Sequence, residues 1–256
     1  MSARIDVQDV SISFGGLKAV QHCTLSVAAG SITGLIGPNG AGKTTLFNMV
    51  AGALKPTGGT ILMDGEDITG VPSDKLYAKG LLRTFQIAHE FGHMTALENL
   101  MMAAPEQQGE NLFNAWFRPG AVREQEQKVR DRALEVIEFL KLDHVRNELA
   151  GNLSGGQKKL LELGRTMMAE ARVVLLDEIA AGVNRTLLQD LLADIEYLNR
   201  DKGYTFFVIE HDMDLIARLC DPVIVMAEGS VMTQGAIADI RNDPAVVEAY
   251  FGAETV

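Results

Sequence analysis

The sequence predicts an α/β fold, with a mostly parallel sheet, an antiparallel β layer and an inserted helical subdomain. Two apolar strands, Val173–Leu176 and Thr205–Ile209, flank a helical stretch at Arg185–Asn199. This strand–helix–strand order is typical of parallel sheets. Near the N-terminus, apolar and polar residues alternate from Ile5 to Phe14, which indicates a half-buried strand. A further apolar strand, Ile32–Ile36, runs directly into a glycine-rich turn.

The other elements follow from the same patterns. Strands expected at Cys23–Val27 and Gly59–Met63 complete the antiparallel layer, and the turn Asp64-Gly65 closes the second of them. The segment Arg123–Leu140 repeats apolar residues at helical spacing, so we expect one buried and one solvated face. We expect one domain over residues 1–256, with its helical subdomain near 87–165. Further helices are expected from Lys43, over Ser154–Glu170 and over Pro244–Phe251.

Charge and composition narrow the function classes. The chain has 256 residues and a formal net charge of −11, which argues against a nucleic-acid partner. The two cysteines, Cys23 and Cys220, are too few for a disulfide or zinc framework, so we expect buried, reduced thiols of a cytosolic protein. No segment approaches the ~20 apolar residues of a membrane helix, and no signal peptide is expected. Any membrane association would therefore come through a partner.

A P-loop follows the strand Ile32–Ile36 and predicts a phosphate site in a P-loop NTPase core. Glycines let backbone N–H groups curl around a phosphate, and the N-terminus of the following helix adds its dipole. Lys43 is expected to reach the β- and γ-phosphates, and Thr44 to bind Mg²⁺ through its hydroxyl. The expected ligands are therefore ATP and Mg²⁺. The motif comprises Gly37, Pro38, Asn39, Gly40, Ala41, Gly42, Lys43, Thr44 and Thr45.

Two acids end the later apolar strand. Asp177 is expected to support the Mg²⁺ shell, because a buried strand aims a carboxylate rigidly. Glu178, one residue on, would point towards the γ-phosphate and the attacking water. Alone this pattern is common, but after a P-loop it indicates catalysis.

A second anion site is expected at Ser154, Gly155, Gly156 and Gln157. Ser154 can cap the helix that follows, and the glycines leave bare N–H groups at its positive end. A single domain does not need two such helix ends to bind one ATP. We therefore expect the two anion sites around each ATP to come from different copies of the chain. The motif therefore predicts a dimer.

These motifs resemble those of the ABC ATPase family, and the resemblance covers nearly the whole chain. It implies that Gln86 contacts Mg²⁺ and water at the hinge to the helical subdomain, and that His211 is a switch residue reaching the γ-phosphate. Phe14 is implied to stack on adenine, with a strand core role as the open alternative. Ile179 stands where the family usually has proline, and Asn184 where it usually has aspartate. We therefore expect altered communication between the two ATP sites.

The resemblance also implies partners. The Ala180–Asn184 loop, Arg83–Gln86, the segment around Ala104–Arg123 and the tail Arg241–Gly252 resemble ATPase subunits of branched-chain amino acid importers. Such a chain would form a homodimer or pair with a paralogue, and would drive two membrane permeases at the cytoplasmic face of the inner membrane. A periplasmic binding protein would take part indirectly. The alternatives are a lipopolysaccharide-export ATPase and a non-transport ABC ATPase. Ser154–Gln157 and His211 argue against a generic P-loop kinase or GTPase.

A cluster of aromatic residues lies in the middle of the chain. The segment 111–117 contains three aromatics, and Met94, Met101 and Met102 lie nearby. A core role for the methionines and a socket for a partner's helix are both open. His89 and His93 have no acids or cysteines at metal-ligand spacing, so we expect surface histidines.

Overall fold

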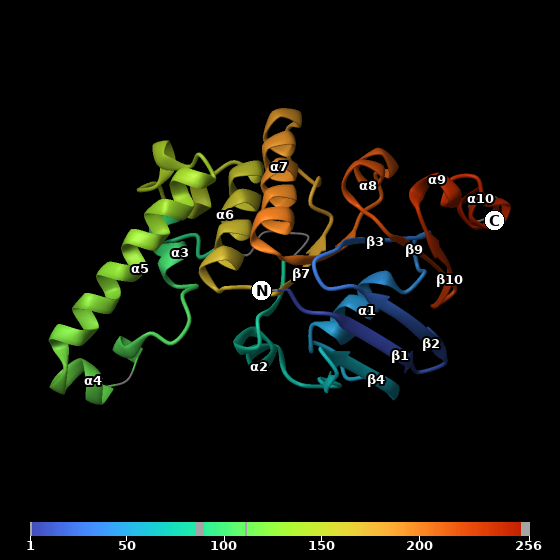
Figure 1. Cartoon of the computed structure of the whole chain (residues 1–256), viewed down its shortest axis with the longest axis horizontal. Coiled ribbons are helices and arrows are strands. Elements are labelled where there is room, and N and C mark those ends of the chain that lie inside the picture. The colour runs from blue at the N-terminus through green and yellow to red at the C-terminus, as the bar shows by residue number, and fades with distance from the viewer. Residues whose placement is uncertain (1, 85–89, 111, 252–256) are drawn as a thin grey trace. The chain divides into compact units, whose positions relative to one another are not determined.

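The computed structural model describes residues 2–84, 90–110 and 112–251 (Figure 1). The chain divides into two compact units. The first comprises Met1–Gln86, Arg172–Ala181 and Leu192–Val256, and the second comprises Ile87–Ala171 and Gly182–Leu191. The range predicted for the helical subdomain, 87–165, lies within the second unit's residues.

The antiparallel layer of the first unit is a four-stranded sheet with the strand order β2-β1-β4-β5. The β1 strand pairs antiparallel with both β2 and β4, as predicted. The β2 strand begins six residues earlier than predicted, at Leu17 rather than Cys23, because its first residues are too polar and exposed to alternate visibly. The strands are β1 (Ile5–Phe14), β2 (Leu17–Val27), β4 (Gly58–Met63) and β5 (Glu66–Asp67).

A six-stranded sheet with the order β10-β9-β3-β8-β7-β6 forms the centre of the first unit. The strands from β9 to β6 run parallel to their neighbours, and β10 pairs antiparallel with β9. The parallel β7–β8 pair confirms the predicted strand–helix–strand order. The strands are β3 (Ile32–Ile36), β6 (Leu81–Arg83), β7 (Val173–Asp177), β8 (Thr205–Ile209), β9 (Val223–Ala227) and β10 (Ser230–Gly235).

The main core of the first unit joins both sheets through α1. Residues of β1, β4, β7, β8 and β9 pack with buried side chains of α1 in one apolar cluster. The rings of Phe47 on α1 and Phe207 on β8 lie 4.8 Å apart between centroids. Figure 1 shows α1 between the two sheets. The helices here are α1 (Lys43–Val50), α2 (Ser73–Ala78), α8 (Met213–Leu219), α9 (Ile237–Ile240) and α10 (Pro244–Phe251).

The second unit is helical in the residues that the structure describes. The helices α3, α5 and α6 pack closely at Gly164, where an added Cβ would lie 2.7 Å from Leu140 and 2.9 Å from Leu100. The α5 helix buries Ala133, Val136 and Ile137, as its apolar spacing predicted. The helices are α3 (Ala96–Met101), α4 (Leu112–Phe117), α5 (Pro119–Phe139) and α6 (Gly155–Met168), with 3-10 turns η1 (Gln108–Glu110), η2 (Asp143–Val145) and η3 (Ala150–Asn152).

The helix α7 (Arg185–Lys202) begins in the second unit and ends in the first. None of the helices in the described parts of the chain is long and apolar enough to cross a membrane.

Candidate active site

The P-loop passes from β3 to α1, and its backbone makes two very close approaches. Gly37 has φ +147°, and a Cβ there would lie 2.0 Å from the carbonyl oxygen of Met226. Gly42 precedes α1 with φ +94°, and its Cβ would lie 2.4 Å from the carbonyl oxygen of Ala19. No side chain larger than hydrogen fits at either position without moving backbone. The loop is therefore held by its neighbours in the first unit.

Lys43 points its ammonium group into the curve of this loop. Its Nζ donates to the carbonyl oxygens of Gly37 at 2.7 Å and Pro38 at 2.9 Å. The residue is 6% exposed, and this burial lowers the pKa of Lys43, while the carboxylates of Glu178 and Asp177 act in the opposite direction. The structure thus brings a buried cation close enough to both acids to interact with them electrostatically.

The acids lie at the carboxyl edge of the parallel sheet. Asp177 ends β7 and lies opposite Ile209, the last residue of β8. Because neighbouring parallel strands end at the same edge, residues that follow β3, β7 and β8 converge there. Glu178 N–H donates to the carbonyl oxygen of Ile209 at 3.0 Å. Nε2 of His211 lies 3.2 Å from Oε1 of Glu178.

The backbone of Glu178 lies in the left-handed region. Its φ is +50°, a conformation that it shares with seven other non-glycine residues among those described. The strand therefore stops at Asp177, and the chain turns sharply. The N–H of Ala181 donates to the carbonyl oxygen of Glu178 at 3.2 Å across this turn.

Asp177 has a partner that the sequence analysis missed. Nη2 of Arg83 lies 2.7 Å from Oδ2 of Asp177, and the two side chains are only 12% and 7% exposed. Arg83 also donates to Oδ1 of Asn48 on α1. No local pattern signalled this pair, because its two residues lie 94 positions apart in the sequence. Arg83 thus ties β6 to β7 and α1.

Glu210 is a second residue to which the sequence analysis gave no role. It follows β8, is 4% exposed, and accepts hydrogen bonds from the backbone N–H groups of Ala180 and His211. Burial raises the pKa of Glu210, and these two hydrogen bonds counteract the rise.

The oxygen donors at this edge fit Mg²⁺. The Asp177 carboxylate and the exposed Thr44 hydroxyl are ligands that Mg²⁺ prefers, and Mg²⁺ at nucleotide sites takes few protein ligands besides water and phosphates. In the described residues no group of three or more His, Cys, Asp or Glu side chains is placed to hold a metal. Gln86, the third predicted ligand, lies outside the described residues.

Phe14 lies on the hairpin that leads to the P-loop. It ends β1 opposite Leu17, and β2 continues to Ala19, whose carbonyl oxygen approaches Gly42. Phe14 is 48% exposed, so the alternative of a strand core residue is wrong. Its predicted role against adenine stays a prediction.

The motif from Ser154 to Gln157 lies in the second unit. Ser154 caps α6: its Oγ accepts from the N–H of Gln157 at 3.4 Å, and Oε1 of Gln157 accepts from the N–H of Ser154 at 2.9 Å. This confirms the predicted cap. A Cβ on Gly155 would lie 2.7 Å from the carbonyl oxygen of Gly182, and one on Gly156 would lie 2.7 Å from Leu187.

The two departures from the family pattern have local structural roles. Ile179 is 3% exposed, so its side chain is buried. Oδ1 of Asn184 accepts from the N–H of Leu187 at 3.0 Å, which is the hydrogen bond of a helix N-cap at the start of α7.

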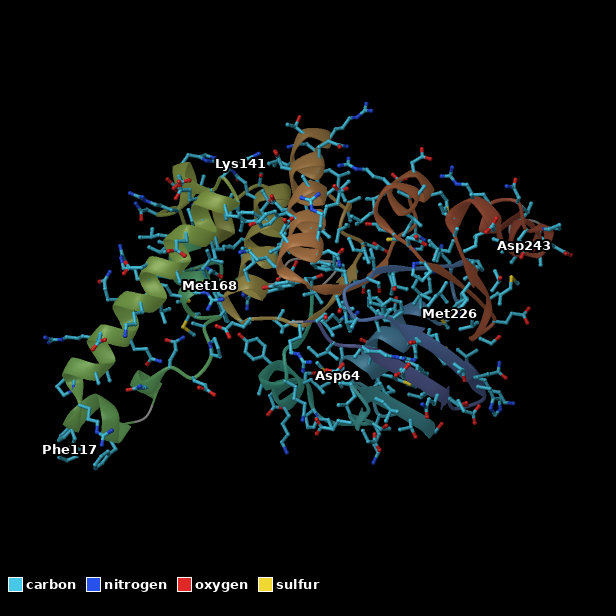
Figure 2. All side chains as sticks on the ribbon, viewed as in Figure 1. Asp64, Phe117, Lys141, Met168, Met226 and Asp243 are labelled. Carbon is cyan, nitrogen blue, oxygen red and sulfur yellow. The ribbon has the colours of Figure 1, made fainter. Side chains whose placement is uncertain are left out.

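The aromatic segment is exposed. Phe113, Trp116 and Phe117 are 59%, 82% and 68% exposed, and Figure 2 labels Phe117 at the end of α4. Met102 is 53% exposed, so a core role for this methionine is wrong. It lines a groove of about 570 Å³ in the second unit with Met94, Met101, Arg123 and other residues. His93 is exposed, and His89 lies outside the described residues.

The parallel sheet, the P-loop between β3 and α1 and the acids at the neighbouring strand end define a P-loop NTPase. A family model described as "ABC transporter" matches residues 20–181, more than half of the chain. The chain belongs to this family of ATP-binding, ATP-hydrolysing transporter subunits.

Relatives match almost over their whole length. The chain is 42% identical over 250 residues to a probable branched-chain amino acid transport ATP-binding protein, LivG, of Archaeoglobus fulgidus, covering 98% of this chain and 96% of that one. It is 40% identical to the high-affinity branched-chain amino acid transport ATP-binding protein BraF of Pseudomonas aeruginosa, covering 97% of each. A crystal structure of the ADP conformation of an ABC transporter cassette matches with TM-score 0.82 and 36% identity, covering 98% of this chain and 100% of that chain.

Proposed function

We propose that this chain hydrolyses ATP to drive import of branched-chain or other hydrophobic amino acids through partner permeases. The observation that carries the proposal is the extent of the similarity to the LivG and BraF proteins, 97% or more of this chain. It reaches beyond the ATPase motifs into the helical unit and the C-terminal tail. ATP hydrolysis alone does not constrain the sequence of the helical unit or of the C-terminal tail, so similarity there supports a shared transport role.

The carboxyl edge of the sheet supplies the chemistry. The P-loop N–H groups and Lys43 bind the β- and γ-phosphates, so the ammonium group exchanges carbonyl partners for phosphate oxygens. Glu178 orients and polarises the attacking water as general base, and His211 contacts the γ-phosphate. Thr44 and Asp177, with Gln86, would hold Mg²⁺, which neutralises phosphate charge when bound. Phe14 would stack on adenine.

Two copies would share each ATP. Ser154, Gly155, Gly156 and Gln157 of one copy would bind the γ-phosphate of the ATP held in the P-loop of the other copy. The capped start of α6 presents N–H groups and a positive dipole end, which suit an anion. ATP then joins the two copies, and hydrolysis releases them. The second copy is an identical chain or a paralogue.

The membrane partners would bind to the second unit. We propose that a short cytoplasmic helix of each of two permeases docks in the groove that includes Met94, Met101 and Met102. Methionine side chains adapt to an apolar helix face, and the other six residues that line the groove, Arg123 among them, are charged or amide side chains that suit the polar face of such a helix. The chain would thereby be peripheral at the cytoplasmic face of the cell membrane. A periplasmic binding protein would deliver the amino acid to the permeases.

Uptake measurements test the proposal. Deleting the gene should abolish uptake of labelled leucine and leave uptake of a control sugar unchanged, and the wild-type gene should restore it. A Glu178→Gln gene should not restore it. Unchanged leucine uptake in a strain without a redundant paralogue would remove the amino-acid assignment. An envelope defect in the same strain would favour lipopolysaccharide export.

A further inference from the structure

The buried carboxylate of Glu210 has no part in the proposed mechanism. Its Oε1 accepts from the N–H of Ala180 at 2.9 Å, and its Oε2 accepts from the N–H of His211 at 3.2 Å. Ala180 lies two residues after Glu178, in the sharp turn, and His211 carries the imidazole that lies against Glu178. One carboxylate therefore joins the backbones that carry both proposed catalytic side chains.

The turn at Glu178 needs such restraint. A φ of +50° costs free energy for any residue with a Cβ, and strained backbone persists only where its surroundings fix it. Glu178 is held on one side by the carbonyl oxygen of Ile209 and on the other by the N–H of Ala181. Ala180 lies within this turn, and the hydrogen bond described for its N–H group is the one to Glu210.

We infer that Glu210 is a positioning residue that holds Glu178 and His211 in the relative geometry that ATP hydrolysis requires. The inference rests on the proposed roles of Glu178 and His211. A carboxylate suits this task because each of its two oxygens accepts one of the two backbone N–H groups. An amide offers only one acceptor oxygen, and its NH₂ group would face the other N–H donor.

A purely structural Glu210 makes a different prediction. Its removal would then lower stability and the amount of folded protein, but each folded molecule would turn over ATP normally. A positioning residue affects kcat, because small displacements of reacting groups slow the chemical step while leaving nucleotide binding intact. Measuring both kcat per folded molecule and the Kd for nucleotide therefore separates a positioning role from a purely structural one.

The chain offers a matched control at the other end of β8. Thr205 is the first residue of β8 and is fully buried, whereas Glu210 follows the last residue of the strand. Its Oγ1 donates to the carbonyl oxygen of Ala3 at 2.9 Å and accepts from the N–H of Gly30 at 2.8 Å. Thr205→Val thus removes two buried hydrogen bonds to backbone away from the acids.

The test compares Glu210→Met, Glu210→Gln and Thr205→Val in the full chain. We expect Glu210→Met to lower kcat for ATP hydrolysis about tenfold or more, with the Kd for a fluorescent ATP analogue within about twofold of wild type. Glu210→Gln should lie between Glu210→Met and wild type. Thr205→Val should lower the melting temperature and leave kcat unchanged.

Wild-type kcat in folded Glu210→Met would overturn the inference. If Glu210→Met does not fold, the kcat of Glu210→Gln is the deciding measurement. A wild-type kcat in Glu210→Gln would also overturn the inference. Glu178→Gln is measured in parallel. If it is inactive while the Glu210 variants are normal, the proposed function stands and only this inference falls. If Glu178→Gln hydrolyses ATP normally, the assignment of Glu178 falls first, and this inference falls with it.

Discussion

Nε2 of His211 lies 3.2 Å from Oε1 of Glu178, and the two residues follow adjacent parallel strands. Both belong to the first unit, so their contact does not depend on the placement of the second unit. The proposed general base and the proposed switch residue are therefore prearranged by the sheet itself, and the γ-phosphate would meet them as a pair.

Glu178→Gln should retain ATP binding and lose hydrolysis. The amide keeps the shape of the side chain and removes the charge that polarises water, so we expect a loss of about a hundredfold or more. Phosphate release and nucleotide affinity are the measurements. Glu138→Gln, at an exposed position on α5, is the control and should behave as wild type. Turnover near the wild-type rate would contradict the assignment of Glu178.

Dimerisation should require ATP. In the Glu178→Gln background, light scattering should show a dimer with Mg-ATP and a monomer without nucleotide. Adding Ser154→Arg should abolish the dimer, because the long side chain would fill the γ-phosphate pocket. Ser154→Thr keeps a capping hydroxyl and is the matched control, since losing the cap itself costs about 1 kcal/mol. Equal dimerisation with and without ATP would argue against a shared nucleotide.

Arg83→Met should destabilise the protein strongly. The change leaves the Asp177 carboxylate buried beside an apolar side chain, and breaking a buried ion pair from one side costs about 3–5 kcal/mol. Urea unfolding measures the loss. The double variant Arg83→Met/Asp177→Asn should lose less than the sum of its single variants, because no unpaired charge remains. Additive losses would mean that the two side chains do not interact energetically.

Both cysteines should be unreactive in the folded protein. Burial raises the pKa of Cys23 and of Cys220 to about 12, so the reactive thiolate is scarce at pH 8. A chromogenic disulfide reagent should therefore label neither thiol in native protein at that pH and both in denaturant. Raising the pH towards 12 increases the thiolate fraction as long as the fold persists. Rapid labelling of native protein at pH 8 would show that at least one thiol is accessible.

Helices and strands with a clear apolar period were predictable from the sequence. The roles of residues that depend on a distant hydrogen-bond or ion-pair partner were not. The strands β7 and β8, the helix between them and the P-loop follow from periodicity and glycine spacing, which are local. The roles of Arg83 and Glu210 depend on contacts with residues 94 and 30 positions away, which a local pattern does not contain. The strands β6, β9 and β10 and the early half of β2 were missed. In β6 and the early half of β2 the apolar runs are brief or exposed and carry no clear period, whereas β9 is a buried apolar run that was overlooked.

Asn184 shows the same limit at a single position. The family resemblance marks it as a departure, and the expectation was altered communication between ATP sites. Its side chain also has a local role at the start of α7, where its Oδ1 accepts a hydrogen bond from the N–H of Leu187, and the altered communication stays a prediction. An aspartate at this position also caps helices well. Asparagine in place of aspartate therefore conserves the helix cap. The loss of a negative charge is the remaining difference through which the substitution would alter communication with the ATP site of a second copy.

A Cβ on Gly155 would lie 2.7 Å from the backbone carbonyl oxygen of Gly182, whereas one on Gly156 would meet mainly the side chain of Leu187, which can shift. Gly155 is thus demanded by the way the start of α6 meets the loop before α7, whether or not a nucleotide is near. A chain of this fold that lost its ATPase would therefore still need a glycine at position 155 for packing. That glycine reports the fold, and its presence without Glu178 does not indicate an active site.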